Sequence, residues 1–142
     1  MTYHFTNPTK AVIDDYMRSA KTIAVVGLSP RETSPAYKVA KRMQEAGYRI
    51  VGINPRYSGE LILGEPVYES LATCPVALDI VDVFRPSEAL ADVARDFLKT
   101  DAKVFWAQLG LESQEAEQLL REQKRDAIVM NKCLKIEYDK MR

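Results

Sequence analysis

The distribution of apolar and polar positions predicts an alternation of buried strands and amphipathic helices. Short apolar runs rich in β-branched residues recur along the chain, and segments with helical spacing separate them. The strands are expected at 22–27, 49–54, 77–84, 103–108 and 127–130. The helices are expected at 9–20, 35–46, 87–98 and 113–123. This alternation is typical of right-handed βαβ units, so we expect one α/β domain with a doubly wound, Rossmann-like parallel sheet.

The remaining segments have weaker patterns. Residues 1–8 are expected to be a lead-in, and 131–142 a polar C-terminal tail. Gly and Pro in 56–68 predict a loop with one short strand near 66–68, and 71–75 is expected to hold a helical turn. A chain of 142 residues, without an internal repeat or a linker, fits a single domain over 1–142.

The stretch 22–35 carries the first indication of function. An apolar strand ends at Gly27, and a helix follows in which Ser34 is a suitable N-cap and Pro35 a suitable first residue. Free backbone N–H groups and the helix dipole then point at one spot, which favours an anion. We therefore expect this stretch to bind a ligand that carries phosphate.

The overall charge limits the class of partner. Twenty basic and twenty acidic side chains cancel, so the chain has no general field for nucleic acid or an anionic membrane. No apolar run is long enough to span a bilayer, and the N-terminus has no signal-peptide pattern. Cys74 and Cys133 lie far apart, with no metal-ligand spacing. These features favour a cytoplasmic protein with reduced thiols and a small-molecule ligand.

The carboxyl ends of the expected strands indicate where that ligand binds. In a doubly wound sheet, ligands lie outside these ends. Here they fall at 27–31, 54–57, 84–86, 108–110 and 131–133, which hold many of the chain's unusual residues. Gly and Pro also collect at strand ends merely to form turns, so each loop alone is weak support.

The dinucleotide fingerprint is not satisfied. After Gly27 its next two glycine positions hold Ser29 and Glu32, and no Asp or Glu falls between Gly47 and Gly59, where the acidic residue is expected. That strand ends at Asn54-Pro55-Arg56, an amide followed by a cation, which disfavours NAD. An arginine there fits a phosphate on the ribose, as in NADP or coenzyme A (CoA), and Arg31 and Lys38 would add charge at the pyrophosphate. The residues alone leave NADP and CoA open.

Six segments in order resemble the small bacterial and archaeal CoA-binding proteins. They are Val25–Pro30, Gly47–Arg56, Leu63-Gly64 with Tyr68–Leu71, Asp82–Arg85, Trp106–Gly110 and Asn131–Cys133. The domain is also similar to the CoA-binding part of succinyl-CoA synthetase and of ADP-forming acyl-CoA synthetases. The resemblance implies CoA, with Gly27–Arg31 near the pyrophosphate, Asn54–Arg56 near the adenosine, and Phe84 with Arg85 beside the nucleotide.

The complete set of expected cofactor-binding residues lies at the strand ends and at the start of the second helix. It consists of Gly27, Leu28, Ser29, Pro30, Arg31, Lys38, Asn54, Pro55, Arg56, Phe84, Arg85, Gln108, Gly110 and Cys133. The position of Leu109 is often proline in the family, so the turn at 108–110 departs from its pattern.

The sequence predicts no catalytic set and no metal site. Ser29 lies in a segment like a nucleophile elbow, but the fifth residue is Arg31, and the one histidine, His4, lies upstream of the serine rather than after it. The synthetases use a phosphohistidine on another domain, which this chain lacks. For Asp79 and Asp82 we favour structural or hydrogen-bonding roles.

Three functions follow as hypotheses. The first is a non-catalytic or regulatory CoA-binding module, the second an NADP-dependent reductase or dehydrogenase, and the third a partner subunit of an enzyme that uses acyl-CoA. A further hypothesis is that Cys133 forms a mixed disulfide with the CoA thiol under oxidation, against the alternative of an inert cysteine. Trp106 and Tyr68 are expected in the core or a cavity wall rather than as stacking platforms.

Overall fold

A five-stranded parallel sheet forms the centre of the molecule. The computed structural model describes residues 2–141, and its strands follow the order β2-β1-β5-β6-β7. They are β1 (Thr22–Val26), β2 (Arg49–Ile53), β5 (Ile80–Val83), β6 (Val104–Ala107) and β7 (Ile128–Val129). All neighbours pair in parallel. The expected doubly wound α/β fold is confirmed.

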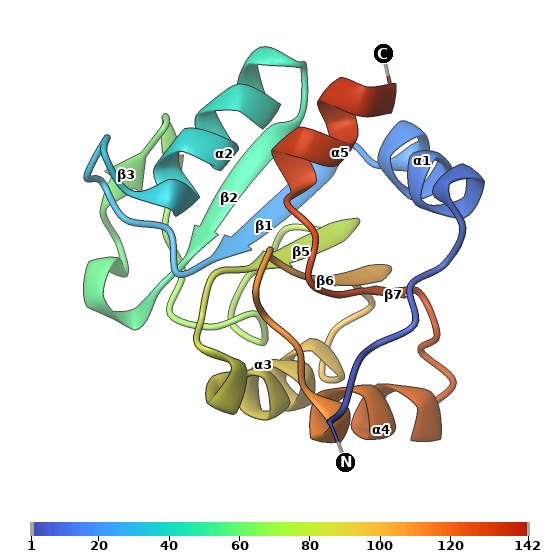
Figure 1. Ribbon diagram of the computed structural model, residues 1–142. Coiled ribbons are helices and arrows are strands. Elements are labelled where there is room, and N and C mark those ends of the chain that lie inside the picture. The colour runs from blue at the N-terminus through green and yellow to red at the C-terminus, as the bar shows by residue number, and fades with distance from the viewer. Residues whose placement is uncertain (1, 142) are drawn as a thin grey trace.

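Helices cover both faces of the sheet (Figure 1). One layer holds α1 (Lys10–Ser19), α2 (Pro35–Glu45) and α5 (Leu134–Met141), and the other holds α3 (Leu90–Phe97) and α4 (Gln114–Glu122). Strand β1 serves both layers, because Ile23 and Val25 pack under α1 and α2 while Ala24 and Val26 pack over α3. Its continuous apolar run reflects burial on both faces.

The helix starts agree with the capping residues in the sequence. Ser34 accepts a hydrogen bond from the N–H of Tyr37, and Ser113 accepts one from the N–H of Ala116. The helix expected at 87–98 begins instead as a 3₁₀ helix, η2 (Ser87–Ala89). Its serine does not cap the helix, because the Ser87 hydroxyl accepts a hydrogen bond from the N–H of Glu112.

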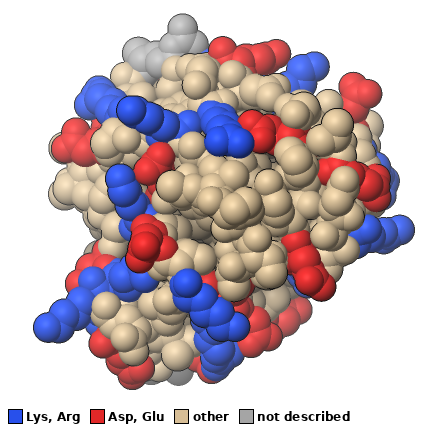
Figure 2. Space-filling model, turned by 180° about the vertical axis from the view of Figure 1, so that it is seen from behind, with Lys and Arg blue, Asp and Glu red and all other residues tan. Residues whose placement is uncertain are grey.

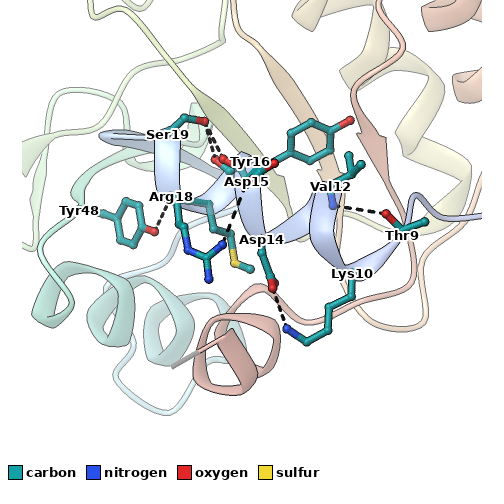
Figure 3. Close-up of polar contacts among 10 residues, drawn as sticks. Thr9, Lys10, Val12, Asp14, Asp15, Tyr16, Arg18, Ser19 and Tyr48 are labelled. Carbon is teal, nitrogen blue, oxygen red and sulfur yellow. Dashed lines mark hydrogen bonds and ion pairs between the residues drawn. The ribbon is translucent and has the colours of Figure 1, made fainter.

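Helix α1, in the first of these helix layers, is held by contacts at its start and at its last turn. Figure 3 shows Thr9 capping its start through the N–H of Val12, Lys10 pairing with Asp14, and the Tyr48 hydroxyl on its last turn. That hydroxyl donates to the carbonyl of Met17 at 2.6 Å. The contact ties α1 to the turn that precedes β2.

The strand expected at 77–84 is shorter in the structure. Asp79 uses its carboxylate to accept hydrogen bonds from the N–H groups of Lys21 and Thr22. It therefore fixes the amino ends of β1 and β5 to each other, and this confirms the hydrogen-bonding role expected for Asp79.

A hairpin replaces most of the loop expected at 56–68. Strands β3 (Leu61–Ile62) and β4 (Glu65–Pro66) pair in antiparallel fashion, and Tyr68 forms a single bridge to Ile53. Leu63 and Gly64 both have positive φ, as a tight two-residue turn requires. The short strand expected near 66–68 thus begins earlier and has a partner.

The prediction of a polar tail at 131–142 is wrong. Residues 134–141 form α5, whose Leu134 is fully buried and whose Tyr138 packs edge-on against Tyr48. Arg42 of α2 pairs with Asp139 at 2.7 Å. The helix is short and mostly polar, so its one buried anchor gives little periodicity. Arg142 lies outside the described residues.

The lead-in is also more ordered than expected. Phe5 is buried in the α3–α4 layer, and the Tyr3 hydroxyl donates to Glu117 at 2.6 Å. The Asn7 side chain donates to the carbonyl of Met130 and accepts from its N–H, which mimics a strand pairing beyond β7. Met1 lies outside the described residues.

Candidate functional site at the carboxyl edge of the sheet

The carboxyl ends of β1 and β5 lie at the point where the strand order reverses, which is where doubly wound sheets bind ligands. Gly27 ends β1 with φ +97°, and a Cβ there would lie 3.0 Å from the carbonyl oxygen of Phe84. Only glycine allows this approach without strain. The loops after β1 and β5 are therefore held against each other.

The loop after β1 is held in place by a buried side chain and by hydrogen bonds. Leu28 is fully buried and its carbonyl accepts a hydrogen bond from the Asn54 amide at 3.0 Å. Ser29 accepts one from the N–H of Arg31 at 3.1 Å, which folds the loop into a turn. Leu28 therefore offers a ligand only its backbone, whereas Pro30 and Arg31 are exposed.

A large apolar cavity lies beside this loop. Its volume is about 620 Å³, and it is bounded by the start of α2, the loops after β5 and β6, and the start of α5. Five expected residues line it: Lys38, Phe84, Arg85, Gln108 and Cys133. Three other lining residues, Pro35, Pro86 and Leu109, lie in stretches where a ligand was expected but were not among the expected cofactor-binding residues. Sequence reasoning missed the rest, namely Val39, Leu111, Lys135 and Ile136. Lys135 and Ile136 were missed because the pattern of 131–142 predicts a tail and not a helix.

The remaining expected residues lie outside this cavity. Asn54 caps the short 3₁₀ helix η1 (Pro55–Tyr57) by accepting from the N–H of Arg56 at 3.1 Å. Pro55 and Arg85 line a second cavity of about 210 Å³ on the α3 side. The N–H of Gly110 donates to the Asn131 side chain. Arg85 is thus the residue common to both cavities.

The arginines at this edge differ from the others in the described chain. Most arginine side chains pair with a carboxylate or a carbonyl oxygen: Arg18, Arg42, Arg49, Arg95, Arg121 and Arg125. Within residues 2–141, only Arg31, Arg56 and Arg85 have neither an ion pair nor a side-chain hydrogen bond, although Arg56 lies over the Tyr57 ring. These three follow β1, β2 and β5.

The molecular surface as a whole has no excess of positive charge. Figure 2 shows basic and acidic groups interspersed on one face, with uncharged surface between them. Positive charge is available to a ligand only where cations stand without acidic neighbours. Lys38 and Lys135 on the wall of the large cavity also form no ion pair with any residue in 2–141.

Gln108 is a buried polar residue of the site, and its side chain accepts a hydrogen bond from the N–H of Leu134 at 2.9 Å. It therefore fixes the first turn of α5 beside the cavity. Trp106 fixes the segment just before α5, because its indole N–H donates to the carbonyl of Lys132 at 2.8 Å. Trp106 is fully buried, and Tyr68 packs partly buried against the α3–α4 layer, as expected for core or wall residues.

Of the structural or hydrogen-bonding roles expected for Asp82, the hydrogen-bonding one is not seen among the described residues. Its side chain is fully buried in β5, and neither carboxyl oxygen has a partner in the described residues. Burial raises the pKa of this carboxyl well above its usual value. A neutral carboxyl in the core is the form that the structure favours.

The other candidates for chemistry lie apart. His4 is 75% exposed and its Nδ1 lies 3.4 Å from Glu112, so its position is that of a surface residue. Cys74 packs against the other end of the sheet, where burial raises the pKa of its thiol. Within residues 2–141 no three metal-ligating side chains gather, and no helix is long and apolar enough to cross a membrane.

Comparison with known proteins gives the family. Residues 21–139 match the family described as the CoA binding domain. The chain belongs to the CoA-binding domain family. It is 46% identical over 130 residues to the uncharacterized protein YneT of Bacillus subtilis, and the match covers 92% of this chain and 94% of that protein. The family resemblance seen in the sequence is therefore confirmed.

Solved structures agree on the fold. A Thermus thermophilus protein superposes with a TM-score of 0.90 at 34% identity, covering 95% of this chain and 100% of the other. An acetyl-coenzyme A synthetase of Ca. Korarchaeum cryptofilum matches 78% of this chain but only 26% of its own length, at 24% identity and a TM-score of 0.62. At that identity the likeness shows the shared fold alone.

Proposed function

We propose that this chain binds coenzyme A across the carboxyl ends of its strands and acts as a binding module without its own catalytic set. The single observation that supports this most is a group of three arginines, Arg31, Arg56 and Arg85, which follow three adjacent strands and form no ion pair or side-chain hydrogen bond within residues 2–141. Arginine side chains suit phosphate oxygens, and CoA carries both a pyrophosphate and a 3′-phosphate. Family membership makes CoA the first choice of ligand.

The sheet order supports one direction for the ligand. Strands β2, β1 and β5 are neighbours, so Arg56, Arg31 and Arg85 stand in that order along the edge. Arg56 takes the 3′-phosphate in this proposal, the loop after β1 and Arg31 take the pyrophosphate, and Arg85 stands beside the nucleotide on the next strand end. Asn54 holds the two loops together rather than contacting the ligand with its amide, because that amide is already engaged.

The deciding experiment is calorimetric titration with CoA, dephospho-CoA, NADP and NAD. CoA is expected to bind more tightly than dephospho-CoA by about 10-fold or more, the size of a lost charge-assisted contact. The Arg56→Ala variant should bind CoA about as weakly as dephospho-CoA. Arg18→Ala, the same change near the amino edge of β1, is the matched control and should leave CoA binding unchanged.

Other results would replace the proposal. Tighter binding of NADP than CoA would favour a reductase or dehydrogenase. Equal affinity for CoA and dephospho-CoA would remove the role given to Arg56. The role as a partner subunit of an enzyme that uses acyl-CoA, and the cytoplasmic location, stay predictions, and pull-down from cell extract tests the first.

A further inference from the structure

The large cavity extends from the start of α2 to the loops after β5 and β6, on the side of the β1 loop that faces away from β2 and Arg56. The strand order places the ends of β6 and β7 beyond β5, on the side opposite β2. Neighbouring strands lie about 4.8 Å apart, so the edge from β2 to β7 spans about 19 Å. A CoA molecule held by its phosphates at β2 and β1 would therefore bring its thiol end to this cavity.

At about 620 Å³, the cavity is much larger than a thiol group would need. Its interior surface comes mainly from apolar side chains, including Val39, Phe84 and Leu111, while Lys38, Arg85 and Lys135 supply cations on the wall. An apolar site of this size with a few charged groups is typical of an amphipathic small molecule. The chemistry fits an apolar chain with an anionic part beside it.

Exposed apolar side chains add an independent observation. Among residues 2–141, large apolar side chains are well exposed at four positions: Val12, Leu61, Leu109 and Ile136. Leu109 and Ile136, which are 63% and 45% exposed, both line this cavity, one from the loop after β6 and one from α5. Their apolar surface stays in contact with water unless a ligand covers it.

We infer that this cavity is an acyl subsite and that the preferred ligand is a CoA thioester with an apolar acyl chain. This rests on the proposed binding of CoA. Leu109 and Ile136 set the preference for chain length in this inference, since both line the cavity and both have exposed apolar surface that a longer chain would cover.

Calorimetric titration with CoA, acetyl-CoA, hexanoyl-CoA and octanoyl-CoA tests the inference. Each buried methylene is worth about 0.8 kcal/mol, so affinity should rise about fourfold per methylene until the cavity is filled. In Leu109→Ala and Ile136→Ala, the ratio of octanoyl-CoA to CoA affinity should fall about five- to tenfold. Leu61→Ala, the same truncation at an exposed leucine outside the cavity, should leave the ratio unchanged.

The outcomes separate the two proposals. Affinity that does not depend on acyl length, while CoA itself binds, overturns the acyl subsite and leaves the proposed function standing. The wild type could instead form a dimer that both Leu109→Ala and Ile136→Ala abolish, with affinity again independent of acyl length. That result would assign the exposed surface of Leu109 and Ile136 to a second copy of the chain, and it would also overturn the acyl subsite. Failure of every CoA species to bind overturns both. Melting temperatures of the variants verify that they fold.

Discussion

The side-chain oxygen of Gln108 accepts the N–H of Leu134 at 2.9 Å, and this bond joins the end of β6 to the first turn of α5. The bond is buried, so removing its acceptor leaves a backbone donor without a partner. Gln108→Ala should lower the free energy of unfolding by about 1–3 kcal/mol. Urea denaturation of the variant and the wild type measures this change in the free energy of unfolding.

A matched control exists for this change. Gln114 is an exposed glutamine on α4 with no side-chain hydrogen bond in the described structure. Gln114→Ala should leave the stability within about 0.5 kcal/mol of the wild type. Equal losses in the two variants would mean that the bond to Leu134 contributes nothing specific.

Asp82 should make the protein less stable at neutral pH. Burial raises its pKa in the folded chain, so the unfolded state releases its proton first as the pH rises. The loss of folding stability therefore begins as the pH rises through about 4, the pKa of an unfolded aspartate. It levels off above the pKa of Asp82 in the folded chain. A tenfold difference in proton affinity between the folded and unfolded states corresponds to about 1.4 kcal/mol. Asp82→Asn should therefore raise the melting temperature at pH 7 by several degrees, and the gain should vanish near pH 3, at about the point where both states hold the proton.

Asp79, just before the amino end of the same strand, provides the opposite case. Burial raises the pKa of Asp79, but the N–H groups of Lys21 and Thr22 and the Lys103 side chain together lower it below its usual value. Asp79→Asn should therefore cost about 1 kcal/mol at pH 7, and the cost should fade as the pH falls through the folded pKa. If both variants shift in the same direction, the assignment of Asp82 as a neutral carboxyl is wrong. Thermal unfolding from about pH 3 to pH 8 measures both.

The close approach at Gly27 predicts a steric effect that a control can isolate. Gly27→Ala combines an unfavourable positive φ with a Cβ only 3.0 Å from the Phe84 carbonyl. Gly64→Ala has a similar φ of +86° but open space around its Cβ. We expect about 1 kcal/mol of destabilisation for Gly64→Ala and at least about 2 kcal/mol for Gly27→Ala. Comparable losses would show that Phe84 gives way. Chemical denaturation distinguishes these results.

The two cysteines report where the ligand binds. Cys133 lines the large cavity, whereas Cys74 lies near the amino edge of the sheet. Saturating CoA should slow alkylation of Cys133 by iodoacetamide about 10-fold or more, as expected for a site that is mostly occupied. Alkylation of Cys74 should not change. Peptide mass spectrometry measures both rates in one sample. Protection of neither cysteine would place the ligand away from this cavity.

The proposed mixed disulfide needs a separate measurement. The Cys133 thiolate would attack the disulfide of oxidised CoA, form the mixed disulfide and release one CoA thiol. Intact-mass analysis should then show a single adduct on the wild type and none on Cys133→Ser. Absence of the adduct on the wild type excludes this hypothesis.

The parallel sheet and four of its helices were predictable because their signals are local. A run such as 23–26 identifies a strand buried on both faces, and Ser34-Pro35 identifies a helix start, without any knowledge of distant residues. The six segments that resemble the CoA-binding proteins further indicated which loops form the site and in which order they follow along the chain. These signals place Arg31, Arg56 and Arg85 at one edge before any coordinate is known.

The rest depends on contacts between distant residues. Helix α5 is stabilised by Gln108, Arg42 and Tyr48, none of which is near it in sequence, so its own pattern is weak. One wall of the large cavity was therefore unpredictable, together with Lys135 and Ile136. The burial of the Leu28 side chain, and the absence of a partner for Asp82 among residues 2–141, are likewise properties of packing, which the residue types at 28 and 82 do not encode.

The paired hydrogen bonds between Asn7 and Met130 occupy the backbone groups of the residue that directly follows β7, the outer strand of the sheet. An open edge strand is a template for another chain, and here the Asn7 side chain blocks continued pairing at the carboxyl end of that strand. Shortening the chain before residue 8 would therefore change how the molecules associate as well as how stable each one is. The first residues thus help to keep this sheet at five strands.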